Sequence, residues 1–286
     1  YCRVQYSPPN YCILQHIAMI AGVGPASEES SMDVSDYIGF VTAEGETFAA
    51  AAAGGALDVP IAPCPGWDMR ELVRHLGLIH LWAAGNVAFP KNDWLVVDDL
   101  PDLADHWPEL ASWPDDTELI AWYRATLANL VDVLESAPTD VACFTFLPAP
   151  TPLTMWARRQ ASEIAIHRFD AESARGLEST FAPSFAADML DELLSGFAPR
   201  HREIDVDRRS VLHVHAEDVD SHWWLTIGPD GIETSREGAD PDLTVAGTAA
   251  ELYLNMWNRT PDSSVRMQGD TGVIDLWHTT CRVRWS

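Results

Sequence analysis

The sequence is short of basic residues, paired cysteines and long hydrophobic runs, and each shortage excludes a class of protein. Lysine and arginine number 18 against 43 acidic residues, so the formal net charge of -25 repels phosphate backbones and argues against a nucleic-acid partner. The five cysteines are scattered and form no CxxC pair, which argues against a disulfide scaffold or a thiolate zinc site and favours a reducing cytoplasm. No apolar run approaches the roughly 20 residues of a membrane helix, so we expect no membrane partner.

The length of 286 residues allows two domains, each with its own core. Residues 1–31 stand apart, because they combine prolines, one short apolar run and a segment rich in serine and glutamate. Only Arg3 precedes the apolar run, which does not favour a secretory signal. We expect residues 1–31 to be a disordered extension, and whether it lies upstream of a natural start at Met32 stays open.

Apolar residues at helical spacing indicate a bundle over residues 32–180. The pattern predicts helices over 33–55, from 68 onward, over 116–138 and over 152–176. The stretch 59–67 cannot be helical, because its prolines remove backbone donors and restrict the chain. Four amphipathic helices joined without strands predict a four-helix bundle, a fold that places metal sites between facing helices.

The pattern changes after Gly176 and predicts a helix and linker over 181–208, then a small α+β domain over 209–286. The expected helix lies within 183–197, and the linker within 200–209. The expected strands are 211–215, 223–227, 232–235, 243–245 and 265–267, and the expected helices are 249–257 and 270–278.

Glu163 and His167 stand four residues apart on the predicted 152–176 helix, one turn above the other on the same face. A carboxylate oxygen and an imidazole nitrogen from one turn can provide two ligands of a zinc-type site, which needs a third ligand from elsewhere. The same spacing suits a solvated ion pair, so the motif alone leaves both interpretations open. His75 lies on the inward face of the helix predicted to begin at 68. An inward histidine is either a core residue or a metal ligand, and both interpretations stay open here.

Other candidate residues have weaker patterns. His80 follows His75 by five residues, about 140° around the helix, so the two cannot share a site. His213 and His215 share one face of a predicted strand, but we expect no carboxylate near that face and favour a packing or surface role. Cys64 precedes a helix start that would stabilise a thiolate, yet its flanking prolines favour packing.

Two separate motifs resemble one known family. Residues 64–77 (CPGWDMRELVRHLG) and 156–172 (WARRQASEIAIHRFDAE) are similar to the mycothiol-dependent maleylpyruvate isomerase family, whose helical bundle is DinB-like. Residues 212–220, 224–231, 243–247 and 252–259 resemble the C-terminal domain of that family, which is related to sterol carrier proteins. The resemblance covers most of the chain from Met32 onward.

The resemblance implies that His75, Glu163 and His167 hold a divalent metal, usually zinc, with a position left for water or a thiol. It also implies mycothiol as the thiol cosubstrate. We hypothesise that the metal lowers the pKa of the bound thiol, which attacks a small electrophilic substrate and gives cis/trans isomerisation or S-transfer. Arg259 is either a clamp for a substrate carboxylate or a surface residue.

Two other functions remain open at this point. A metal-dependent hydrolase would need a general base, and Asp170 returns to nearly the same helix face as Glu163 but lies two turns away, which is too far. A non-enzymatic binding or regulatory protein would instead use the C-terminal domain to hold an apolar ligand without metal.

Overall fold

The computed structural model describes residues 32–89, 106–112, 114–238 and 240–281. The expected disordered extension, residues 1–31, lies outside the described residues. Within the described part, none of the helices combines the length and the apolar character needed to cross a bilayer.

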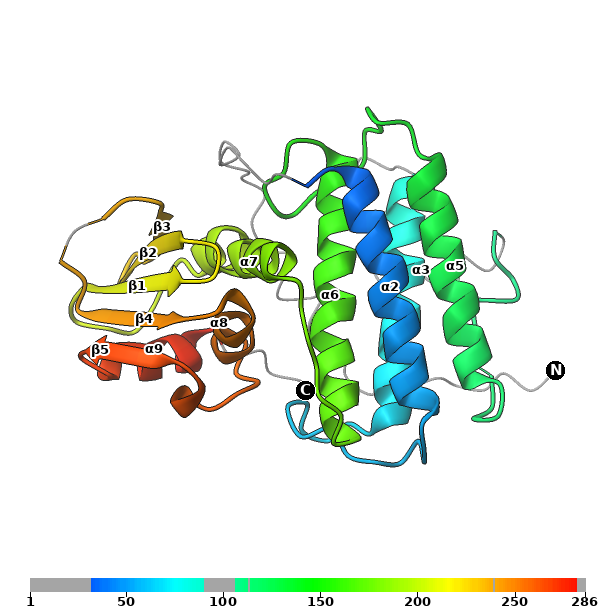
Figure 1. Cartoon of the computed structure of the whole chain (residues 1–286). Helices are drawn as coiled ribbons and strands as arrows, with labels where there is room; N and C mark the ends of the chain where they lie inside the picture. The colour runs from blue at the N-terminus through cyan, green and yellow to red at the C-terminus, as the bar shows by residue number, and fades with distance from the viewer. Residues whose placement is uncertain (1–31, 90–105, 113, 239, 282–286) are drawn as a thin grey trace.

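Four long helices form the first part of the molecule: α2 (Val34–Ala53), α3 (Met69–Ala88), α5 (Leu119–Ser136) and α6 (Pro152–Ala174). They run side by side in Figure 1, and α2 and α3 each pack against both α5 and α6. Every helix therefore has two neighbours, which is the arrangement of a four-helix bundle and confirms the predicted fold.

Side-chain caps explain where three of these helices begin. Asp33, Asp68 and Thr151 each accept a hydrogen bond from the backbone N–H three residues later, which satisfies a donor that the helix leaves unpaired. Asp36 completes a reciprocal capping box with Asp33. Before α3, the proline-rich stretch is a non-helical loop of turns, as its composition predicted, and a β-bridge joins Pro60 to Asp68.

Helix α6 is buried on nearly every side, although it carries many polar residues. The buried polar side chains on α6 are Thr154, Arg159, Gln160, Ser162, His167, Arg168, Asp170 and Glu172. Burying a charge is costly unless a partner of opposite charge and hydrogen bonds accompany it. The charged residues of α6 are therefore the place to look for a site.

After the bundle, α7 (Pro183–Asp191) is followed by a π-helical turn, Glu192–Phe197, and a 3-10 turn, Ala198–Arg200. The single helix expected over 183–197 therefore changes its hydrogen-bonding pattern at Glu192. The change coincides with ion pairs that Asp191 and Glu192 make with Arg158 and Arg159 of α6. Wide turns of this kind are frequent at functional sites.

The last part of the chain is a mixed sheet with strand order β3-β2-β1-β4-β5. β1 and β4 pair in parallel, and the other neighbours pair antiparallel. The strands are β1 (Ser210–Ala216), β2 (Ser221–Gly228), β3 (Gly231–Ser235), β4 (Leu243–Gly247) and β5 (Arg266–Gly269). Two helices, α8 (Ala249–Met256) and α9 (Gly272–Thr280), contact β1. This confirms the expected α+β fold.

The sheet part of the molecule contacts α7 and the bundle through α8 and the turn that follows it. α7 packs against α8, as Figure 1 shows. From α8, the Tyr253 hydroxyl donates a hydrogen bond of 3.1 Å to the backbone carbonyl of Ser162 on α6. The C-terminal part of the chain therefore lies directly against the helix that carries the buried charges.

Candidate metal centre

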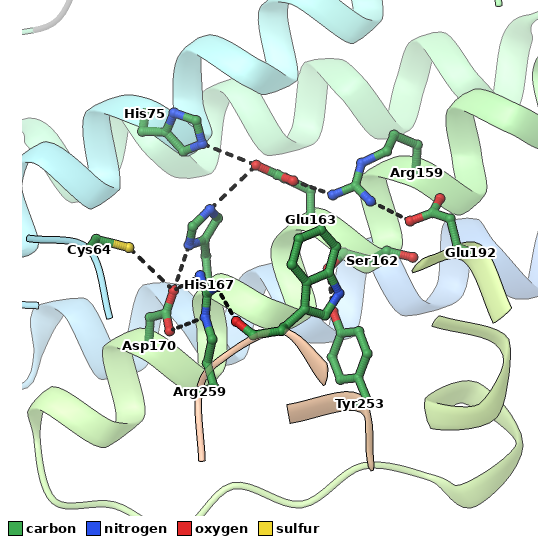
Figure 2. Close-up of polar contacts among 11 residues, drawn as sticks. Cys64, His75, Arg159, Ser162, Glu163, His167, Asp170, Glu192, Tyr253 and Arg259 are labelled. Carbon is green, nitrogen blue, oxygen red and sulfur yellow. Dashed lines mark hydrogen bonds and ion pairs between the residues drawn. The ribbon is translucent and has the colours of Figure 1, made fainter. Parts of the chain in front are cut away.

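His75 of α3 meets Glu163 and His167 of α6 inside the bundle (Figure 2). Glu163 Oε1 lies 3.1 Å from His75 Nε2 and 3.4 Å from His167 Nε2. The side chains of His75 and His167 are 7% and 2% exposed, whereas that of Glu163 is 18% exposed. The carboxylate is therefore the most accessible of the three groups.

These three donor atoms suit a divalent ion. All three lie within 4.8 Å of one another. Ligand bonds of about 2.0–2.2 Å place the donors of a tetrahedral zinc site about 3.3–3.6 Å apart, close to the two oxygen–nitrogen distances found here. The three residues implied by the family resemblance therefore lie together, and their donor atoms have the spacing that metal binding requires.

Asp170 supports His167 from behind. Its Oδ2 lies 2.9 Å from His167 Nδ1, so the imidazole keeps its Nδ1 proton and turns Nε2 toward Glu163. Arg259 reaches across from the C-terminal part of the chain, as Figure 2 shows, and donates to both Asp170 oxygens at 3.1 and 3.0 Å. Asp170 is therefore engaged with His167 and Arg259, which does not favour it as the general base of a hydrolase.

Arg159 holds the other oxygen of Glu163. Its guanidinium bridges Glu163 Oε2 and Glu192 Oε2, as Figure 2 shows. Arg159 is thus shared between two carboxylates, and Arg259 is balanced by Asp170. With neutral imidazoles, the cluster keeps one net negative charge, so a divalent ion would remain positive overall.

Burial shifts the pKa values of the three candidate ligands. Burial alone would raise the pKa of Glu163, but Arg159 and the two histidines outweigh it and hold that pKa well below its usual range. Burial lowers the pKa of His75 despite its hydrogen bond to Glu163. For His167 burial also opposes the charged form, yet bonds to Asp170 and Glu163 raise its pKa. The carboxylate is therefore ionised, and His75 is neutral, as metal ligation requires.

Cys64 and Trp67 complete the surroundings. Cys64 Sγ lies 3.7 Å from Asp170 Oδ2, and burial, followed by the charge of Asp170, raises the pKa of its thiol. The helix start does not stabilise a thiolate here, because the thiol is fully buried next to a carboxylate. The ring centroids of Trp67 and His75 are 4.9 Å apart, with the two ring planes inclined by 58°.

The structure gives His80 a partner outside this site. His80 Nδ1 pairs with Thr126 Oγ1 at 3.1 Å, on another face of α3 from His75, as expected. Sequence reasoning considered Asp170 only as a general base and missed its pairing with His167, which lies three residues earlier on the same face. The four-residue spacing between Arg159 and Glu163 is a similar signal that was available in the sequence.

A four-helix bundle in which two histidines and a glutamate converge, followed by an α+β region, defines a class of protein with a candidate divalent-metal centre. The family described as the mycothiol maleylpyruvate isomerase N-terminal domain matches residues 41–172. The MDMPI C-terminal domain, where MDMPI abbreviates the same enzyme, matches residues 181–276. The chain therefore belongs to the mycothiol-dependent maleylpyruvate isomerase family.

Solved structures agree with this assignment at the level of the fold. A histidine-to-alanine mutant of the mycothiol-dependent maleylpyruvate isomerase is 12% identical to this chain, with 83% of this chain and 93% of the mutant covered and a TM-score of 0.58. Another crystal structure of that isomerase is 13% identical over the same shares, with a TM-score of 0.54. A comparison with curated proteins gave no match.

Proposed function

We propose that this protein is a metal-dependent enzyme that activates mycothiol for isomerisation or S-transfer on a small electrophilic substrate. The observation that carries the proposal is the convergence of His75, Glu163 and His167 within a fold that belongs to the isomerase family. The thiol is inferred from the family's description and from the related crystal structures. Zinc is the proposed metal, because nitrogen and carboxylate donors suit it.

A divalent ion held by these residues would lower the pKa of a thiol beside it, so that a thiolate forms at neutral pH. His75 and His167 direct their Nε2 atoms toward Glu163 Oε1. Asp170 keeps His167 in the required tautomer through its bond to Nδ1. Arg159 fixes the Glu163 carboxylate through Oε2 and leaves Oε1 facing the imidazoles.

Arg259 is proposed to bind a carboxylate of the substrate. Its Nε and Nη2 donate to Asp170, and its Nη1 donates to the carbonyl of Trp257. A guanidinium carries five N–H donors, so one donor on each terminal nitrogen is left by these three bonds. If the Trp257 carbonyl takes the outer Nη1 hydrogen, the two remaining donors are parallel and match a carboxylate.

The two proposed reactions differ only in which group leaves. In isomerisation, the thiolate sulfur bonds to an unsaturated carbon, the π bond breaks and its electron pair moves to an electron-withdrawing group of the substrate. The resulting single bond then rotates, and the returning pair restores the double bond and expels the same thiolate. In S-transfer, the carbon–sulfur bond persists and another group departs with its electron pair. The proposal places the enzyme in the cytoplasm, supported by the free thiols of Cys64, Cys143 and Cys281.

Metal content tests the proposal. Elemental analysis of purified wild type, His75→Ala and Glu163→Ala should show the loss of about one equivalent of metal in each variant. Mycothiol added to cobalt-substituted wild type should change the visible spectrum, because a thiolate ligand alters the absorption of cobalt.

His80→Leu is the matched control, because His80 lies on the same helix and is bonded to Thr126 rather than to the site. It should keep the full metal content. Wild type that takes up no metal at this site after reconstitution, while both alanine variants remain folded by circular dichroism, would contradict the proposal. A non-enzymatic binding protein would then be the better interpretation.

A further inference from the structure

A second group of histidines lies on the half-buried face of the C-terminal sheet. Leu212 and Val214 of β1 are buried, and the alternating His213 and His215 face the other side. On the neighbouring strand β2, His222 is paired directly with His215. These side chains come from one β-hairpin and include none of the candidate ligands in the bundle.

A carboxylate joins this group from the hairpin turn. Asp220 Oδ1 lies 3.5 Å from His215 Nε2 and 3.4 Å from His222 Nε2. The expectation that no carboxylate lies near this strand face was wrong, because strand alternation gives no information about a residue in the connecting turn. Asp220 has a φ of 50°, in the left-handed region that aspartate tolerates better than most residues.

We propose that His215, Asp220 and His222 form a second binding site for a divalent transition metal such as zinc. The three donor atoms lie within 4.8 Å of one another. The two oxygen–nitrogen distances, 3.5 and 3.4 Å, match the roughly 3.3–3.6 Å between donors around a tetrahedral zinc ion. Imidazole and carboxylate donors together suit zinc, nickel and copper rather than calcium or magnesium.

Exposure of the three side chains allows an ion to reach them. The side chains of His215, His222 and Asp220 are 27%, 34% and 89% exposed. His215 Nε2 is nevertheless itself shielded from solvent and makes no hydrogen bond, and its 3.5 Å contact with Asp220 Oδ1 is an ion pair only when the ring is protonated. Folding removes water from such a nitrogen and supplies no hydrogen bond in its place, which costs free energy. A bond to a metal ion would replace the lost interaction.

His213 orients His222 for binding. Its Nε2 lies 3.0 Å from His222 Nδ1, and its Nδ1 lies 3.4 Å from Thr244 Oγ1. If His213 Nδ1 donates to the threonine hydroxyl, His213 Nε2 accepts the proton of His222 Nδ1. His222 then presents the lone pair of Nε2 toward Asp220, which is the tautomer a metal requires. His213 is a positioning residue in this site.

The rings of His215 and His222 stack, with centroids 4.0 Å apart and planes inclined by 16°. A metal lies close to the plane of each imidazole that binds it, so a shared ion turns at least one ring out of this stack. Metal binding should therefore shift the NMR resonances of both histidine rings. These shifts report on the site separately from the measured affinity.

Calorimetric titration with zinc chloride tests the site in the full chain. The parent variant is Glu163→Gln, which removes a ligand of the bundle site and leaves the hairpin untouched. We expect this parent to bind one zinc at the hairpin. Adding His222→Asn or His215→Asn should weaken that binding at least about tenfold, and His213→Asn should weaken it about 10-fold to 100-fold.

Two further variants keep the test decisive. Asp220→Asn removes the charged ligand and retains a residue that tolerates the left-handed turn, so it should weaken zinc binding without unfolding the hairpin. His278→Asn is the control, because His278 pairs with Asp262 alone, at 3.0 Å. It should leave the titration unchanged.

A parent that binds no zinc would overturn the proposal. Equal affinities in the parent and in the His215, His222 and Asp220 variants, with histidine resonances that do not move, would overturn it as well. The experiment also distinguishes this proposal from the one for the bundle site. If the bundle site binds no zinc, wild type and Glu163→Gln should bind equal amounts of zinc, all of it at the hairpin.

Discussion

The ion pair between Asp170 and Arg259 should stabilise the contact between the bundle and the C-terminal domain. The side chains of Asp170 and Arg259 are 0% and 6% exposed, so removing either partner leaves a buried charge without its main partner. Breaking a buried pair in this way costs about 3–5 kcal/mol. For a chain of this size, each kcal/mol corresponds to about 2–4 °C in the melting temperature, so Arg259→Met should melt about 6–20 °C below wild type.

A double-mutant cycle measured by urea unfolding isolates the pair. Asp170→Asn and Arg259→Met should each destabilise the protein, and the double variant should lose clearly less than the sum, with a coupling of at least about 1 kcal/mol. The matched control is the exposed pair of Arg209 and Asp230, at 3.0 Å, whose cycle should show no measurable coupling.

Additive losses at Asp170 and Arg259 would refute the reasoning, and so would an Arg259→Met variant that melts with wild type. Either result would mean that water or another group already compensates the buried charges. The same variants should be compared with metal removed, because Asp170 also supports His167.

Three further predictions concern the bundle. Gly77→Ala should destabilise the protein by about 1–3 kcal/mol in thermal melts, because a Cβ there would lie 2.2 Å from the Trp122 ring, whereas the unobstructed helical Gly39→Ala should stabilise it by about 0.5–1 kcal/mol. Burial lowers the pKa of His80 to about 3, so below about pH 6.5 the unfolded chain takes up a proton that the native state refuses. Wild type should therefore lose more stability than His80→Leu in urea melts between pH 7 and pH 5, and parallel losses would contradict this. Cys64 should resist iodoacetamide at pH 8 in the native protein and react after unfolding, as peptide mapping would show, because its thiol is buried and its pKa is raised.

Local sequence signals were sufficient for the helices and for two candidate ligands. Asp33 and Asp68 marked helix starts because a side-chain cap acts within three residues of itself. Glu163 and His167 could be paired because helix geometry alone fixes the relation between residues four apart. Local signals could not assign His75 as a third ligand, because its position opposite Glu163 and His167 depends on how α3 packs on α6. The family resemblance supplied that information.

Contacts between distant segments could not be predicted in the same way. Arg259 and Asp170 are 89 positions apart, and Arg159 and Glu192 are 33 apart, so their contacts depend on how the C-terminal part docks. The histidine group on the hairpin likewise depends on the register that pairs His215 with His222. Short-range periodicity carries no information about docking or register.

The charges on α6 also set an order of events during synthesis. When α6 first emerges from the ribosome, Arg159 and Asp170 are in the exposed chain, but Glu192 is still inside the ribosome and Arg259 has not yet been made. A bundle that closed at that moment would bury charges without their partners, so its interior should stay loosely packed and hydrated until the later segments arrive. The candidate metal centre would then be among the last parts of the molecule to mature, although its ligands are all made within the first two thirds of the chain.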